Sequence, residues 1–176
     1  IQDLMRASAG LNLALDYLPG AVAFDPLVHR PDARLASAIV WFDALVSNVD
    51  RTARNTNLLM WHRQPWLIDH GAALIFHHQW ELALARARLP FAPVRDHVLL
   101  AAAGAIAEVD AALAGRLSAA VIEAIVDLVP DDWLEDSPRF AGKADQRAAY
   151  RQYFEARLQA PRAFVEEALH ARSLHL

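Results

Sequence analysis

The chain has 176 residues, 55% of them hydrophobic and 22% charged, which is the size and composition of one domain with a sizeable core. This balance excludes an intrinsically disordered chain, and a net charge of −4 without a basic block excludes the positive field that non-specific nucleic-acid binding requires. Because the sequence contains no cysteine, it forms neither disulfides nor thiolate metal sites.

The chain has no candidate membrane-spanning or secretory segment. Its longest apolar run, from Val98 to Ala107, ends at Glu108 and is well short of the roughly 20 residues that a bilayer requires. The opening IQDLMRASAG lacks the basic head and apolar centre of a signal peptide. We therefore expect a cytoplasmic protein with no membrane partner. Since the chain begins with Ile1 rather than Met, we also expect it to be part of a longer protein.

Residues 1–31 predict a hinge-like connector followed by a loop. Apolar and polar residues alternate from Leu11 to Leu18 and the pattern stops at Pro19-Gly20, which predicts a short strand or an extended connector. If the groups that would cover this segment are missing, its apolar row is exposed to solvent. We therefore expect that the row can pair with a second copy of the chain and form a homo-oligomer.

Residues 32–80 predict a helix, a polar loop, a β-hairpin and a second short polar motif. Asp32 is expected to cap the helix, which ends near Ser47. The apolar positions of the helix recur at three- and four-residue spacing, at Leu35, Ile39, Phe42 and Val46. The apolar runs 58–61 and 66–68 flank HRQP, which suits a hairpin turn. The large aromatic residues of this region are expected in the core: Trp41, Phe42, Trp61 and Trp66.

Residues 81–176 predict a helical subdomain, so residues 1–176 are expected to form a single, mainly α domain. The alanine-rich stretch from Arg95 to Gly115 predicts one helix with Gly115 as its C-cap. The next helix is expected to begin after Ser118 and to stop before Pro130. Two further helices are predicted in KADQRAAYRQYFEARLQ and PRAFVEEALHARSL.

The polar stretch NVDRTARNTN, residues 48–57, contains the order of side chains that phosphoryl transfer requires. Asp50 precedes Asn55 by five positions, as a catalytic carboxylate precedes a metal-binding amide in kinases. The hairpin then delivers Asp69, a second oxygen ligand of the kind that Mg²⁺ prefers. Gly71 follows two residues later and lets the backbone leave the metal and nucleotide site without a Cβ clash.

The segment WFDALVSNVDRTARNTNLLMWHRQPWLIDHGAALIFHHQW resembles the HipA-like kinase family, a divergent branch of the protein-kinase-like fold, and the resemblance extends over nearly all of the chain. It implies that Asp50 is the catalytic base and that Asn55 and Asp69 bind Mg²⁺ and ATP. It also implies that Arg54, one position before the asparagine, approaches the phosphate or the substrate. The acceptor would be a Ser or Thr hydroxyl of an unknown protein.

The chain departs from this family in one large respect. A kinase N-lobe supplies a strand lysine and a loop that covers the nucleotide. Here the only lysine is Lys143, far downstream, and the glycines are scattered singly. The sequence therefore corresponds to a C-lobe with a small hairpin between catalytic loop and Asp-His-Gly motif. We expect such a lobe to bind ATP very weakly and to turn over negligibly by itself.

The polar residues also have structural interpretations. Asp50 and Asn55 can stabilise a turn, as such residues often do. Asn48 and Asn57 are expected to support the loop by side-chain hydrogen bonds rather than to bind a ligand. Arg51 is expected to be structural or exposed, and for Arg54 the catalytic and structural interpretations stay open.

Two further functions remain open beside the kinase. One is a non-catalytic helical interaction or regulatory module of kinase ancestry. The other is a metal-dependent phosphohydrolase that would use Asp69 with nearby histidines. The histidines closest to it in sequence are His62, His70, His77 and His78. Against this third function, no pair of them has the i, i+4 spacing of a metallohydrolase helix.

Overall fold

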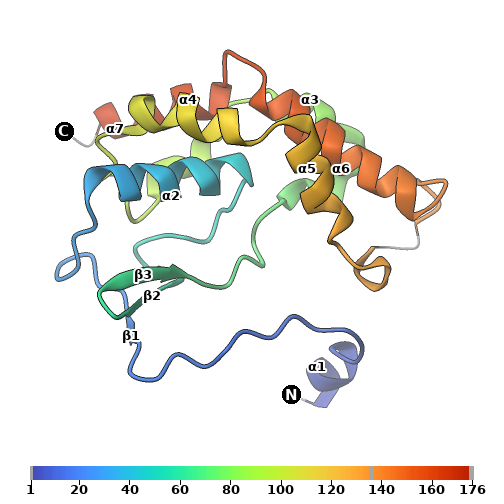
Figure 1. Ribbon diagram of the computed structural model, residues 1–176, viewed down its shortest axis with the longest axis horizontal. Coiled ribbons are helices and arrows are strands. Elements are labelled where there is room, and N and C mark those ends of the chain that lie inside the picture. The colour runs from blue at the N-terminus through green and yellow to red at the C-terminus, as the bar shows by residue number, and fades with distance from the viewer. Residues whose placement is uncertain (1, 135–136, 175–176) are drawn as a thin grey trace.

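A computed structural model describes residues 2–134 and 137–174, and it is mainly helical with one small sheet (Figure 1). Its α-helices are α1 (Gln2–Ala7), α2 (Ala33–Leu45), α3 (Ala83–Ala87), α4 (Ile106–Arg116), α5 (Ala119–Asp127), α6 (Lys143–Leu158) and α7 (Ala163–Ser173). Short 3-10 helices are η1 (Ile75–Leu82), η2 (Ala92–Asp96) and η3 (Asp131–Trp133). The strands are β1 (Val22–Ala23), β2 (Leu58–Trp61) and β3 (Gln64–Leu67). The predicted mainly α character is confirmed.

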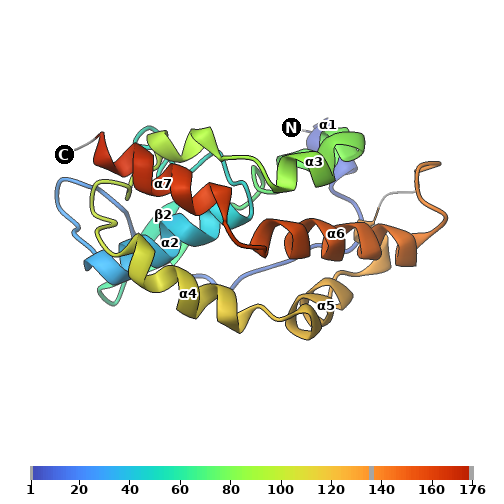
Figure 2. The ribbon, with the colours of Figure 1, turned by 90° about the horizontal axis from the view of Figure 1, so that it is seen from above.

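Helix α2 is central to the fold and packs against α4 and α7 (Figures 1 and 2). The predicted cap is confirmed, because the Asp32 carboxylate accepts the backbone N–H groups of Arg34 and Leu35 at 3.0 Å. The predicted inward face is only partly correct. Ile39 is buried, but Phe42 is 39% exposed, and Asp43 is fully buried. The helix is therefore rotated so that a carboxylate faces the interior.

Two apolar clusters form the interior. The main cluster joins α2, α7 and the turns after η2. Its largest fully buried members are Val40, Leu58, Val94, Leu99, Leu100, Ile106 and Phe164. The smaller cluster attaches η1 and α3 to α6, and its buried members are Phe76, Ala83, Ala87 and Tyr153. The segment that follows the hairpin is thereby fixed against the helical body.

The sheet is antiparallel with the strand order β1-β2-β3. The predicted hairpin is present, but its second strand begins at Gln64 rather than at Trp66, and Trp61 pairs with Gln64. Only His62 and Arg63 form the turn, and both have a left-handed backbone with φ of 47° and 64°. Two left-handed residues suit the twist of a tight hairpin. Trp66 is 43% exposed, so its predicted core position is wrong, whereas Trp41 is buried.

The alanine-rich stretch does not form the single helix that its composition predicts. Helix α4 begins only at Ile106, residues 98–105 form turns, and Gly115 lies within α4 instead of capping it. These turns bury Leu99 and Leu100 in the main cluster, so tertiary packing overrides the helix propensity of alanine. The prediction for α5 is confirmed, because the Ser118 hydroxyl accepts a backbone N–H from within its first turn.

The N-terminal segment 11–18 is extended and belongs to no strand, so the connector prediction is correct and the strand alternative is wrong. In Figure 1 it runs below the hairpin from α1, and the carbonyl oxygen of Leu11 accepts the indole N–H of Trp133 in η3 at 2.7 Å. Leu13, Leu15 and Tyr17 are at least 74% exposed. Within the described residues, no helix combines the length and hydrophobicity needed to cross a bilayer.

Arg157 of α6 is a buried cation that binds helix ends. Its guanidinium donates to the carbonyl oxygen of Ala44 in α2 at 2.5 Å and to that of Ala87 in α3 at 3.2 Å. It also lies over the rings of Tyr153 and Phe164. Burial lowers the pKa of Arg157, and among the described residues carbonyl dipoles and ring faces offset the desolvation of this charge.

We expect Arg157→Met to lower the free energy of unfolding by about 2–4 kcal/mol, because two buried carbonyl groups lose a charged donor. Urea denaturation measures the loss. The matched control on the same helix is Arg151→Met, because Arg151 only pairs with the exposed Glu123 and Asp127. The control should cost less than about 1 kcal/mol. Equal losses for both variants would contradict a special role for Arg157.

Candidate functional site

The loop between α2 and β2 brings Asp50 and Asn55 into direct contact. The Asn55 Nδ2 group donates to Asp50 Oδ2 at 2.9 Å, so the five-residue spacing closes the loop on itself. Asn55 is exposed and Asp50 is half-buried. Arg54 is also exposed, and it makes no hydrogen bond or ion pair within the described residues. The outer face of the loop therefore carries a carboxylate, an amide and a cation.

Asn48 and Asn57 hold Asp50 from the inner side of the loop, as predicted. The Asn48 Oδ1 atom accepts the backbone N–H of Asp50 at 3.1 Å. The Asn57 Nδ2 group donates to the Asp50 carbonyl oxygen at 2.8 Å and to Asp50 Oδ2 at 3.2 Å. Within the part of the chain that the structure describes, no hydrogen bond reaches Asp50 Oδ1. One carboxylate oxygen is thus fixed, and the other is available.

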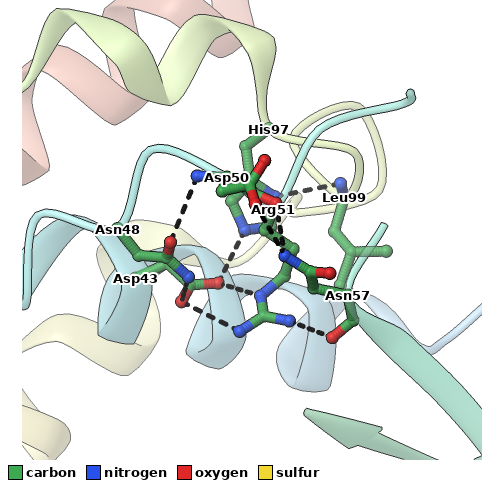
Figure 3. Close-up of polar contacts among 7 residues, drawn as sticks. All are labelled: Asp43, Asn48, Asp50, Arg51, Asn57, His97 and Leu99. Atoms are coloured by element: carbon green, nitrogen blue, oxygen red, sulfur yellow. Dashed lines mark hydrogen bonds and ion pairs between the residues drawn. The ribbon is translucent and has the colours of Figure 1, made fainter. Parts of the chain in front are cut away.

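Beneath the loop lies a buried ion pair between Asp43 of α2 and Arg51 (Figure 3). The Arg51 Nε group donates to Asp43 Oδ2 at 2.5 Å, and a terminal nitrogen donates to Asp43 Oδ1 at 3.3 Å. Another terminal nitrogen donates to the carbonyl oxygen of Asn57. Both side chains are at most 1% exposed, so the structural interpretation of Arg51 is confirmed. Asn48 completes the shell by donating to Asp43 Oδ1 at 2.9 Å.

His97, which directly follows η2, contacts the same carboxylate. Its Nε2 atom lies 3.0 Å from Asp43 Oδ2, and its Nδ1 atom accepts the backbone N–H of Leu99 at 3.0 Å. Since Nδ1 accepts, Nε2 must carry the proton and donate to Asp43. The backbone adds a second attachment, because the N–H of Val98 donates to the carbonyl oxygen of Arg51 at 3.0 Å.

These contacts explain how a carboxylate stays ionised in the interior. Burial alone would raise the pKa of Asp43. Hydrogen bonds from His97, Arg51 and Asn48, together with the charge of Arg51, outweigh burial and hold the pKa of Asp43 below its ordinary value of 3.8. Each oxygen of the Asp43 carboxylate therefore meets two nitrogen donors, and such hydrogen bonding is the condition for a stable buried charge.

The Asp-His-Gly motif lies beside this loop, at the end of the hairpin. The backbone N–H of Ile68 donates at 3.0 Å to the carbonyl oxygen of Asn57, the residue whose side chain holds Asp50. Asp69 is exposed and has a left-handed backbone with φ of 49°. Its Oδ1 atom accepts the N–H of Gly71 at 3.4 Å, and a Cβ at Gly71 would lie only 3.3 Å from this oxygen. Glycine therefore gives the Asp69 carboxylate room.

His70 shows that the motif is electrostatically coupled to the buried network. Its ring packs edge-on against Phe42, with centroids 6.0 Å apart. Partial burial and the charge of Arg51 lower the pKa of His70, and these effects outweigh the opposite influence of Asp43 and Asp69. The imidazole is therefore neutral at pH 7 and adds no positive charge to the site.

The structure gives no support to a histidine metal centre. Among the described residues, no group of three or more His, Cys, Asp or Glu side chains is placed to hold a metal ion. His77 instead lies 2.7 Å from the hydroxyl of Tyr150 and stacks on Trp80. His77 and His78 belong to the 3-10 helix η1.

Asp43 and His97 are part of this region, although the sequence pattern around the loop does not point to either residue. Asp43 carries a detectable signal, because it is the one charged residue among the apolar positions of WFDALV. A charge inside an apolar helix face usually has a buried partner. His97 carries no such signal, since it lies in a stretch that composition predicts as helix.

Comparison of the chain with protein-family models, with curated proteins and with solved structures gives no match. Any function proposed for the chain therefore depends on its own residues and on the geometry described above.

We expect Asp43→Asn to lower the free energy of unfolding by about 3–5 kcal/mol near neutral pH, because Arg51 stays buried without a counter-charge. Since the pKa of Asp43 is lower in the folded chain than its ordinary value of 3.8, the unfolded chain binds more protons in that range. The stabilisation is complete above this ordinary value and is lost as the pH falls through the folded pKa.

Urea denaturation of the wild type and of Asp43→Asn at several pH values measures this effect. The difference between the two should shrink below about pH 4. Asp132→Asn, a change at an exposed carboxylate, serves as the control and should follow the wild type. A difference that stays constant down to acid unfolding would contradict an ionised Asp43.

Proposed function

We propose that the chain is the helical C-lobe of a HipA-like kinase, which transfers the γ-phosphoryl group of ATP to a Ser or Thr hydroxyl of a protein. The observation that carries this proposal is the hydrogen bonding of Asp50. Its backbone and Oδ2 atom are held by Asn48, Asn55 and Asn57, while no described group bonds Oδ1. The resemblance of the sequence to that family supplies the reaction.

Asp50 Oδ1 is the atom that would meet the acceptor hydroxyl. It would accept the hydroxyl hydrogen bond and orient the oxygen for in-line attack on the γ-phosphorus. A bond forms between this oxygen and phosphorus, the bond from phosphorus to the leaving ADP oxygen breaks, and the hydroxyl proton passes to Oδ1. Because Oδ2 is fixed by two amides, the carboxylate cannot swing away from the acceptor.

Asn55 and Asp69 are the residues that would hold Mg²⁺, and their free atoms fit it. Asn55 uses its Nδ2 group on Asp50, so its amide oxygen is left for a ligand. Asp69 uses Oδ1 on the N–H of Gly71, which leaves Oδ2. Amide and carboxylate oxygens are hard ligands of the kind that Mg²⁺ prefers. When bound, the ion would neutralise charge on the nucleotide phosphates, and the exposed Arg54 would add to this.

One observation favours a second candidate, a non-catalytic interaction module. Lys143, the first residue of α6, is the only lysine of the sequence. Its Nζ atom donates to the carbonyl oxygen of Leu134. Within the described residues, no lysine therefore lies at the catalytic loop to bind the α- and β-phosphates. The kinase proposal thus requires a further lobe that covers the nucleotide, and the module does not.

Calorimetric titration of Mg-ATP into the full-length gene product that contains this chain distinguishes the two candidates. We expect binding, and we expect Asp69→Ala to weaken it at least about tenfold through loss of a metal ligand. Asp132→Ala removes an exposed carboxylate on η3 and should leave binding unchanged. No binding to a folded wild type would exclude the kinase and leave the interaction module.

We also propose that the apolar row of residues 11–18 pairs with a second copy of the chain. The segment is extended and belongs to no strand, and Leu13 and Leu15 are exposed. Sedimentation over a wide concentration range should show self-association that Leu13→Lys with Leu15→Lys abolishes. Leu128→Lys, at another exposed leucine, is the control. A monomer at every concentration would refute this pairing.

A further inference from the structure

The buried network beneath the catalytic loop joins three separate parts of the chain. Asp43 comes from α2, Arg51 and Asn57 come from the loop between α2 and β2, and His97 comes from the segment after η2. Figure 3 shows the side chains of Arg51 and His97 joined to Asp43 by dashed lines, close to Asp50. His97 is 54 residues away from Asp43 in the sequence and is buried. None of the proposed reacting groups touches it.

We propose that His97 is a positioning residue, which acts through Asp43 to fix the orientation of Asp50. This inference rests on the proposed phosphoryl transfer, because it gives the network a consequence for the rate of that reaction. His97 does not touch substrate or nucleotide in this role. It supplies one hydrogen-bond donor to a carboxylate on which the whole loop depends.

Two chains of hydrogen bonds run from Asp43 to Asp50. In the first, Asn48 donates to Asp43 Oδ1 at 2.9 Å and accepts the backbone N–H of Asp50 at 3.1 Å. In the second, Arg51 binds Asp43 and donates to the carbonyl oxygen of Asn57, whose amide holds the carbonyl and Oδ2 of Asp50. Any rotation of the Asp43 carboxylate would therefore change both attachments of Asp50.

His97 is the group that prevents this rotation. Asp43 Oδ2 accepts two donors, Arg51 Nε at 2.5 Å and His97 Nε2 at 3.0 Å. Arg51 belongs to the loop itself and would move with it, whereas His97 belongs to a different element. The imidazole is in turn fixed by the N–H of Leu99, at 3.0 Å from Nδ1. The carboxylate plane is thus set from outside the loop.

Only one protonation state of His97 satisfies these contacts. The N–H of Leu99 requires a lone pair on Nδ1, and the carboxylate of Asp43 requires a proton on Nε2. In the neutral Nε2–H tautomer both conditions hold. The charges of Asp43 and Arg51 then cancel, so the buried network carries no net charge.

The two functions of the ring can be separated by a matched pair of variants. His97→Gln places an amide N–H where Nε2 lies and keeps a donor for Asp43. His97→Asn places an amide oxygen where Nδ1 lies, so it keeps the acceptor for Leu99 and loses the donor. A merely structural role at Leu99 predicts a loss in the Gln variant, whereas a positioning role through Asp43 predicts a loss in the Asn variant.

The experiment measures phosphoryl transfer from Mg-ATP by the full-length gene product and both variants, with folding checked by circular dichroism. For His97→Asn we expect kcat to fall about 10- to 100-fold with little change of KM for ATP, since the loop is misplaced rather than the nucleotide site. His97→Gln should stay within about threefold of the wild type. Asp110→Asn breaks a remote ion pair with Arg162 and serves as the control for a general loss of stability.

A second readout does not depend on activity. Nitrogen-15 NMR should find His97 as the Nε2–H tautomer, and hydrogen exchange of the Asp50 amide should speed up in His97→Asn but not in His97→Gln. If the wild type transfers no phosphoryl group, the proposed function fails, and the exchange data alone decide whether His97 positions Asp50. Unchanged exchange in His97→Asn, or equal kcat for both variants, would overturn the inference.

Discussion

The structure around the candidate site depends on one ionised carboxylate, Asp43, in the middle of helix α2. Removing a charge from water is costly, and an interior tolerates it only where hydrogen bonds and a counter-charge replace the lost hydration. Here Arg51, His97 and Asn48 provide that replacement. The same requirement that keeps the carboxylate stable also draws two other parts of the chain, the loop 48–57 and the segment after η2, to fixed places against α2.

Helix α2 therefore serves two purposes with different faces. Ile39 and Val40 contribute to the main apolar cluster, while Asp43 supports the loop. A helix that places a carboxylate on its buried side must turn another residue outward, and Phe42 is half-exposed as a result. At the surface, Phe42 packs against the ring of His70 and so supports the Asp-His-Gly motif.

Whether a feature could be predicted from the sequence depends on how far apart in the chain its interacting residues lie. The cap at Asp32, the hairpin and the loop support by Asn48 and Asn57 were predictable, because each depends on neighbours within about ten residues. The turns of residues 98–105 were not, since burial of Leu99 and Leu100 against distant helices decides them. The contact of His97 was not predictable for the same reason, because its partner Asp43 is 54 residues away. Spacing rules describe local chemistry and cannot reveal a contact of that length.

The polarity of the loop 48–57 has two causes, one on each side. The inward-facing side chains, which are hydrogen-bonded within the buried network, are Asn48, Arg51 and Asn57. The side chains of Arg54 and Asn55 face solvent. A loop that only had to cross the surface could satisfy its backbone with water, at no cost in buried charge. Here an ion pair, a histidine and two amides hold the loop from its inner side. This arrangement is explained if the outer face of the loop must be rigid. Rigidity at the outer face matters chiefly to chemistry, where a carboxylate displaced by an ångström loses much of its effect. The inner half of the loop therefore makes the outer half rigid, which is a condition that the proposed phosphoryl transfer would require.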